Sequence, residues 1–251
     1  MSRKILVALD VESRDEALTL ADTLRGAVGG FKIGSRLFTA EGPSIVRTLT
    51  ERGDRIFLDL KFHDIPNTVA TAVAAATGLG VWMVNVHAGG GAAMMRAARA
   101  AADETAAKHH ASPPLVIAVT VLTSMSQAAL RETGVVIDLM DQVLSLAELA
   151  KDAGLDGVVA SPRDTSAIRG RCGADFTIVT PGIRGGAAAL RQSSGQAATK
   201  DDQERTMSPA EAVAAGASYL VVGRPIIGAS DPLEAAHRIA ESLTDKAEGG
   251  R

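Results

Sequence analysis

Acidic and basic residues alternate in one short block of the sequence, Asp59-Leu60-Lys61-Phe62-His63-Asp64. Asp59 and Lys61 stand two positions apart, so on an extended strand their side chains point to the same face. A carboxylate beside Lys61 keeps its ammonium protonated even when that group is removed from water. Such a pair is either an internal ion pair that holds strands together or part of an active site. Lys32, at the end of the preceding apolar run, adds a second cation and favours an active site.

Glycine and arginine recur together in two later loops. One loop contains Gly182-Ile183-Arg184-Gly185-Gly186, and the other begins with Gly223-Arg224. The backbone N–H groups of glycine and the planar fork of arginine both bind phosphate oxygens. The two loops together therefore predict a phosphate site.

The segment between these two loops is long and built from small residues. Residues 185–202 are mostly Ala, Gly, Ser and Gln and have no apolar periodicity. Loops longer than about 12–15 residues in compact domains are usually functional lids or disordered. We expect 185–202 to be a mobile loop that orders over a bound phosphate, and the alternative is an insertion that plays no part.

Eight short apolar runs, separated by helical stretches, must position these residues. Ser13-Arg14-Asp15-Glu16 has the pattern of a capping box, and 92–107 and 139–153 are predicted as helices. Alternating strands and helices without a linker favour a single (β/α)8 TIM barrel over residues 1–251, with a parallel eight-stranded core. A doubly wound open sheet is the runner-up, but the turn after the first run lacks the glycines of a dinucleotide site. The runs are 5–10, 30–34, 55–62, 81–88, 115–122, 157–161, 176–183 and 219–224.

Polar residues end nearly every one of these runs, at the side of a barrel where active sites lie. Burying an ion without a partner costs several kcal/mol, so we expect these groups to meet one another or a ligand. We expect His87 to support the site through hydrogen bonds. Ser161 and Thr180 are interpreted either as polar groups of the core or as ligand contacts. The terminal residues are Asp10, Lys32, Asp59, Lys61, His87, Thr120, Thr123, Ser161, Arg184 and Arg224.

The composition excludes several classes of protein. The 251 residues carry 26 Lys+Arg and 29 Asp+Glu, a net charge of −3, and neither sign forms a long block, so no nucleic acid is expected as partner. The single cysteine, Cys172, cannot form an internal disulfide. No stretch approaches the roughly 20 apolar residues of a membrane span, and the first apolar run is too short for a signal peptide. We therefore expect a cytoplasmic protein without a membrane partner.

The block Asp-Leu-Lys-Phe-His-Asp-Ile-Pro-Asn-Thr at 59–68 resembles the signature of the orotidine 5′-phosphate decarboxylase family, in its bacterial form. The resemblance extends through 8–10, 31–34, 86–88, 118–125 and both phosphate loops, and so covers nearly the whole chain. It implies a homodimeric barrel without metal or coenzyme. The reaction implied is conversion of orotidine 5′-monophosphate to uridine 5′-monophosphate and CO₂, the last step of de novo pyrimidine synthesis.

The resemblance also implies roles for the charged residues. Lys61 would stabilise and protonate the carbanion at C6 of the pyrimidine, and Asp59 would lie against the departing carboxylate and orient Lys61. Lys32 and Asp10 would contact the ribose hydroxyls and complete the charge network. Asp64 would act in the site of the partner subunit.

Further substrate contacts follow from the same resemblance. Ile65 and Thr68 would reach the partner subunit's site together with Asp64, and Thr123 would face the pyrimidine. The phosphate loop is longer here than is usual in the family, so Gln192 and Gln196 remain alternatives to the Gln assigned to bridge phosphate and base. The residues assigned to the phosphate side are Arg184, Gln203, Gly223 and Arg224.

Two rival functions are weighed against this one. Mg²⁺-dependent sugar-phosphate decarboxylases and synthases of the same barrel group share an Asp-x-Lys-x-x-Asp strand, but they bind the metal with a carboxylate where this chain has Lys32. A non-catalytic barrel that binds a phosphometabolite would need the phosphate loops but not the lysine and aspartate array. The array is complete here, which favours the decarboxylase.

Overall fold

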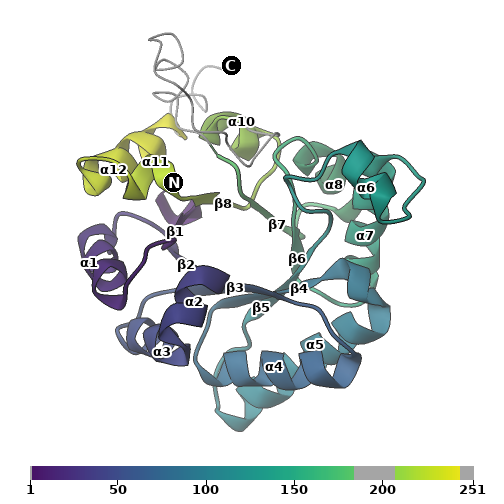
Figure 1. Cartoon of the computed structure of the whole chain (residues 1–251), viewed down its shortest axis with the longest axis horizontal. Coiled ribbons are helices and arrows are strands. Elements are labelled where there is room, and N and C mark those ends of the chain that lie inside the picture. The colour runs from purple at the N-terminus through teal and green to yellow at the C-terminus, as the bar shows by residue number, and fades with distance from the viewer. Residues whose placement is uncertain (1, 184–206, 244–251) are drawn as a thin grey trace.

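The computed structural model describes residues 2–183 and 207–243. Eight parallel strands close into a barrel in chain order, with β8 paired to β1. Figure 1 looks into this ring of strands, with the helices arranged around it. The predicted (β/α)8 barrel is confirmed, and the open sheet is excluded. The strands are β1 Ile5–Ala8, β2 Gly30–Gly34, β3 Ile56–Phe62, β4 Met83–His87, β5 Leu115–Val119, β6 Gly157–Val159, β7 Thr177–Thr180 and β8 Tyr219–Val222.

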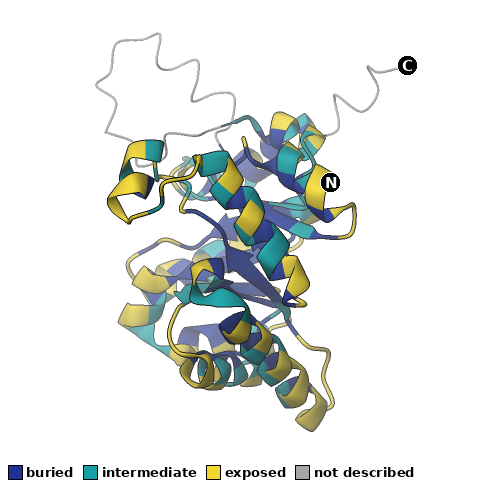
Figure 2. Cartoon of the chain, turned by 90° about the vertical axis from the view of Figure 1, so that its right-hand side faces the viewer, coloured by how far each residue is buried: buried dark blue, intermediate teal, exposed yellow. Residues whose placement is uncertain are grey.

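Helices cover the outside of the barrel, and their outer faces are exposed while the strands at the centre are buried (Figure 2). Two predicted helices, 92–107 and 139–153, are confirmed within one residue at each end, as α5 and α7. None of the helices that the structure describes is long and apolar enough to cross a membrane. The helices are α1 Arg14–Leu24, α2 Ser35–Glu41, α3 Pro43–Glu51, α4 Pro66–Gly78, α5 Gly91–Lys108, α6 Gln127–Glu132, α7 Leu139–Asp152, α8 Thr165–Cys172, α10 Pro209–Ala214, α11 Arg224–Ile227 and α12 Pro232–Ser242, with 3-10 turns at Ser2–Lys4 (η1) and Ala88–Gly90 (η2).

The predicted capping box at α1 is only half formed. The Ser13 hydroxyl accepts a hydrogen bond from the Glu16 N–H at 3.3 Å, as predicted. The Glu16 carboxylate, however, accepts from the N–H of Glu12 at 3.3 Å rather than from that of Ser13. The helix start is therefore capped, but the reciprocal bond reaches one residue further back along the chain.

Alternation along the strands separates two apolar layers. One layer fills the barrel interior and includes Phe57, Ile117 and Val179, and the other lies between strands and helices and includes Leu58 and Val84. Because Phe57 faces inward, Asp59 and Lys61 on the same strand are directed toward the interior, at its C-terminal mouth.

Several strands end before the apolar runs that predicted them. Strand β1 ends at Ala8 rather than residue 10, and β5 ends at Val119 rather than residue 122. The apolar run continues because the connections at the mouth are themselves buried: Leu9, Val11 and Val121 are at most 5% exposed. Apolar character therefore reports burial in this region, not strand pairing.

Candidate active site

Four charged side chains form a row at the C-terminal mouth of the barrel. The Lys61 ammonium lies 2.7 Å from Oδ1 of Asp59. The Lys32 ammonium lies 3.6 Å from Oδ2 of Asp59 and 3.1 Å from Oδ1 of Asp10. Charges of opposite sign therefore alternate from Asp10 through Lys32 and Asp59 to Lys61, and each buried charge has a partner.

Burial is uneven along this row, and it determines which group can meet a ligand. The side chains of Lys32 and Asp59 are 10% and 14% exposed, whereas that of Lys61 is 37% exposed. Burial alone would raise the pKa of Asp59, but the charges of Lys32 and Lys61 and two hydrogen bonds hold it below its ordinary value. Asp59 is therefore ionised at neutral pH. Of the two lysines that flank it, Lys61 is the more exposed and is the one that can meet a ligand.

Lys61 stands on an irregular part of β3. The strand is in register with β4 at Leu58 and Val84, and pairing resumes at Phe62 and Val86, so β3 bulges between Leu58 and Phe62. Lys61 has φ +54°, in a region that residues other than glycine rarely adopt. Asp59 and Lys61 do lie on the same face, as predicted. The prediction assumed a regular strand, and that assumption is wrong, because the bulge in β3 sets their geometry.

Asn85, which was not among the residues predicted from the sequence, holds this bulge in place. Its Oδ1 accepts a hydrogen bond from the Lys61 N–H at 2.8 Å, and its Nδ2 donates to Oδ1 of Asp59 at 2.7 Å. Asn85 is fully buried on β4. The signal was present, because Asn85 is a polar residue inside an apolar run and two positions before His87. One amide thus fixes the backbone of the lysine and the carboxylate of its partner.

We expect Asn85→Ala to lower kcat about 100-fold, because a displacement of Lys61 by about 1 Å has an effect of this order. KM is expected to change much less, since Asn85 contacts the pair that performs the chemistry and not the open end of the site. Steady-state kinetics and thermal unfolding measure both effects.

The matched control is Thr165→Val, which removes another buried hydrogen bond, from Thr165 to the carbonyl of Ser161 at 3.2 Å. It is expected to lower stability and leave kcat within a few-fold of the wild-type value. An equal fall of kcat in both variants would assign Asn85 to stability alone.

The residues assigned to a partner's site lie between the end of β3 and the first turn of α4. Asp64, Ile65 and Thr68 are exposed, and the Ile65 side chain is 66% exposed. Oδ1 of Asp64 accepts from the N–H of Ile65 at 2.6 Å, and no ion pair joins Asp64 to Lys61 within the described residues of this chain. Their role in a partner subunit stays a prediction.

The phosphate-side residues are described in part. Gly223 directly follows β8 and lies next to the charged row. A Cβ built on it would lie 3.6 Å from Cβ of Ala8 and 4.0 Å from Oδ2 of Asp10. Arg224 is exposed at the start of α11, and Thr123 is half-buried in the loop after β5. The predictions that lie outside the described residues concern Arg184, Gln203, the alternatives Gln192 and Gln196, and the loop 185–202.

Three hydroxyl groups that ended apolar runs bind within the protein. Thr120 donates to the carbonyl of Val159 at 3.2 Å, and the Ser161 hydroxyl accepts from the N–H of Arg163 at 3.3 Å. The Thr180 hydroxyl lies 3.4 Å from that of Thr165. All three are buried. These contacts favour the interpretation of Ser161 and Thr180 as polar groups of the core.

His87 does not support the site in the predicted way. Its side chain makes no hydrogen bond to a described residue, and the centroid of its ring instead lies 5.4 Å from that of His63. Burial, the charge of His63 and the charge of Lys61 lower the pKa of His87 more than Asp59 raises it. The imidazole is therefore neutral at pH 7, chiefly because burial disfavours its charged form.

The closed barrel and the lysine-centred row at its mouth define a (β/α)8-barrel enzyme whose charged site lies at the C-terminal ends of the strands. Residues 3–239 match the profile of the Orotidine 5′-phosphate decarboxylase / HUMPS family, and the chain belongs to this family.

Individual relatives are similar over their whole length. Orotidine 5′-phosphate decarboxylase of Syntrophotalea carbinolica is 51% identical over 99% of this chain and 98% of that protein. Its counterpart in Moorella thermoacetica is 52% identical over 96% of this chain and 92% of that protein. The crystal structure of orotidine 5′-phosphate decarboxylase from Lactobacillus acidophilus is 36% identical, with a TM-score of 0.82, and the match covers 96% of this chain and 99% of that one.

Proposed function

We propose that this chain converts orotidine 5′-monophosphate to uridine 5′-monophosphate and CO₂, the last step of de novo UMP synthesis. The observation that carries the proposal is the half-exposed ammonium of Lys61, held 2.7 Å from the buried carboxylate of Asp59. Relatives about 50% identical over nearly the whole chain are named for this reaction.

Lys61 can meet both needs of the chemistry. When the bond between C6 and the carboxylate carbon breaks, CO₂ leaves and the electron pair stays on C6, where no adjacent carbonyl delocalises it. A fixed cation beside C6 stabilises that charge, and a proton then moves from Nζ of Lys61 to C6. The resulting amine is 37% exposed as a side chain, so solvent can reprotonate it.

Asp59 holds the lysine in place. Because Asp59 is ionised and accepts a hydrogen bond from Nζ of Lys61, it restricts the position of the ammonium group. Asn85 fixes Asp59 and the Lys61 backbone together, so the cation is in place before the substrate arrives. We infer that Asp59 orients Lys61 and that Lys32 balances the charge of Asp59 on its other side.

The order of the described groups along the mouth supports this proposal. Gly223 lies next to Asp10, Asp10 is paired with Lys32, and Asp59 is paired with both Lys32 and Lys61. A nucleotide laid along this line would place its phosphate, its ribose hydroxyls and its C6 against these groups in turn. Phosphate binding, far from the bond that breaks, would then serve to orient the pyrimidine.

The remaining contacts and the assembly are part of the proposal. Arg184 and Gln203 complete the phosphate side, and Thr123 faces the pyrimidine. The enzyme works as a homodimer in the cytoplasm, with Asp64, Ile65 and Thr68 of each subunit in the other's site. The exposure of Asp64, Ile65 and Thr68 supports this arrangement, because these side chains are accessible to another subunit.

The Mg²⁺-dependent sugar-phosphate enzymes are not favoured. The two carboxylates at the mouth, Asp10 and Asp59, are already bound by ammonium groups, and Lys32 stands where a metal ligand would be needed. Within the described residues no group of three or more His, Cys, Asp or Glu is placed to hold a metal ion. The test of the proposed function is turnover of orotidine 5′-monophosphate by the purified chain with a chelator in excess.

A further inference from the structure

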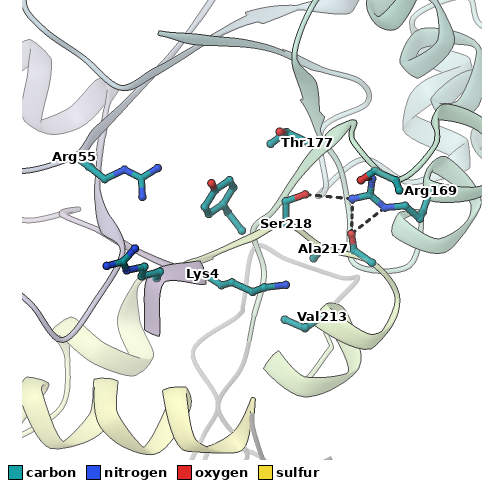
Figure 3. A pocket seen from close by; sticks show the side chains of 11 residues that line it. Lys4, Arg55, Arg169, Thr177, Val213, Ala217 and Ser218 are labelled. Carbon is teal, nitrogen blue, oxygen red and sulfur yellow. Dashed lines mark hydrogen bonds between the residues drawn. The ribbon is translucent and has the colours of Figure 1, made fainter. Parts of the chain in front are cut away.

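A second concave site lies at the N-terminal end of the barrel, opposite the charged mouth. It is a pocket of about 600 Å³, within the range of small-molecule sites. Its lining comes from the η1 turn before β1, from the starts of β3, β7 and β8, and from α8. In Figure 3, Lys4 and Arg55 lie on one side of this pocket and Thr177 and Ser218 on the other.

The lining is positively charged. None of the eleven described residues around the pocket is acidic, and four are basic: Arg3, Lys4, Arg55 and Arg169. Arg169 is already used by the fold, since its guanidinium donates to the carbonyls of Gly173, Ala174, Phe176 and Gly216 and to the Ser218 hydroxyl. The other three cations have no ion pair with any residue that the structure describes.

Carboxylates that precede nearby strands are occupied elsewhere. Asp54, just before β3, binds Arg25 through both of its oxygens at 2.9 and 2.8 Å. Asp156, just before β6, accepts from Arg99 and from the N–H of Val116, both at 2.7 Å. Asp54 and Asp156 therefore do not neutralise the pocket. Asp175, exposed next to the lining residue Ala174, forms no ion pair with Arg3, Lys4 or Arg55 within the described residues.

The backbone brings two of the cations together. A Cβ built on Gly29 would lie 2.0 Å from the carbonyl oxygen of Arg3, and one built on Gly30 would lie 2.5 Å from that of Arg55. Only the absence of side chains at these two glycines lets both arginine-bearing segments pack against the start of β2. The close packing of the segments that carry Arg3 and Arg55 thus depends on these two glycines at the start of β2.

Aromatic rings position one of these cations. The Arg55 guanidinium lies 3.7 Å from the centroid of the Trp82 ring, and the Trp82 ring meets the edge of Tyr219 at 5.0 Å. Tyr219 itself lines the pocket, with the hydroxyl-bearing residues Thr177 and Ser218. Stacking on Trp82 holds the arginine without neutralising it, so its donors remain available.

We propose that this pocket binds a small molecule that carries two or more linked phosphates. Three cations in one concavity, none in an ion pair with a described residue, concentrate positive potential, and arginine forks bind phosphate oxygens in pairs. A single phosphate would neutralise two of the three cations, whereas an oligophosphate matches all of them. The pocket lies at the opposite end of the barrel from Lys61, so it is separate from the proposed substrate site.

The test is calorimetric titration of the purified chain with inorganic tripolyphosphate at low ionic strength. We expect saturable binding, with a concurrent change in the fluorescence of Trp82, the single tryptophan of the chain, which lies against Arg55 and Tyr219. Lys4→Gln is expected to weaken binding at least tenfold, and Arg3→Gln serves as a second variant if the first does not fold. The matched control Arg47→Gln, at an exposed arginine of α3 that does not line the pocket, is expected to bind like the wild type.

A further variant locates the binding. Arg224→Ala removes a proposed phosphate contact at the mouth, and tripolyphosphate binding is expected to persist in it whether or not the chain is a decarboxylase. Absence of saturable binding would overturn the proposal. So would equal weakening by Lys4→Gln and Arg47→Gln, which would indicate non-specific charge, or loss of binding in Arg224→Ala, which would place the anion at the mouth.

Discussion

Replacing Lys61 with alanine is expected to abolish turnover of orotidine 5′-monophosphate, by at least about 10⁴-fold in kcat, because it removes both the cation and the proton donor. The fold is expected to survive. The Lys61 side chain is already 37% exposed, and alanine at φ +54° carries about the same backbone strain as lysine. Absorbance assays, by stopped flow or in the steady state, measure the rate, and circular dichroism shows whether the variant is folded.

Two further variants separate charge from proton donation and from surface effects. Lys61→Arg keeps a positive charge but cannot release its proton at neutral pH, so it is expected to stay far below wild-type turnover. Lys151→Ala, at an exposed lysine on α7, is expected to leave turnover unchanged. A folded Lys61→Ala variant that retained more than a trace of activity would refute the role of Lys61.

Mixing inactive Lys61→Ala and Asp64→Ala subunits is expected to restore about a quarter of the wild-type activity. If Asp64 acts across a dimer, each mixed dimer has one site with both substitutions and one site with neither. Random exchange makes about half of the dimers mixed, and half of the sites in these are intact. The measurement is activity against time after mixing, with subunit exchange verified by mass or by a tagged subunit.

The control for this experiment is a mixture of Lys61→Ala with Asp59→Ala subunits. Both residues belong to the same row in one chain, so no mixed dimer would hold an intact site and no recovery is expected. Failure of the Asp64 mixture after proven exchange would place Asp64 in its own subunit's site.

The barrel could be predicted from the sequence because its signal is local. Short apolar runs alternate with helical stretches eight times, and each run corresponds to one observed strand. The ends of the strands could not be placed, because residues such as Leu9 and Val121 are apolar for burial in the mouth and not for pairing. The pattern of apolar residues indicates whether a side chain is buried, whereas strand pairing ends where the neighbouring strand ends.

The charged residues of the site could be found for the same reason. Asn85 also stands out as a polar residue in an apolar run, but its role could not be predicted. Asp59 and Lys61 are two positions apart and stand out in an apolar run. Asn85 acts on them only because β3 bulges against β4, and that register shift depends on a strand more than 20 residues away in sequence. The positive φ of Lys61 could not be predicted either, since lysine is not a residue type that favours the left-handed backbone region.

The most direct test of the central claim is the absorbance assay of orotidine 5′-monophosphate turnover by the purified chain, run with and without excess chelator. Lys61, not a metal ion, is proposed to stabilise the carbanion, so the account predicts conversion to uridine 5′-monophosphate and CO₂ at the same rate in both conditions. Loss of turnover on chelation, with recovery on addition of Mg²⁺, would contradict the account and favour the sugar-phosphate enzymes.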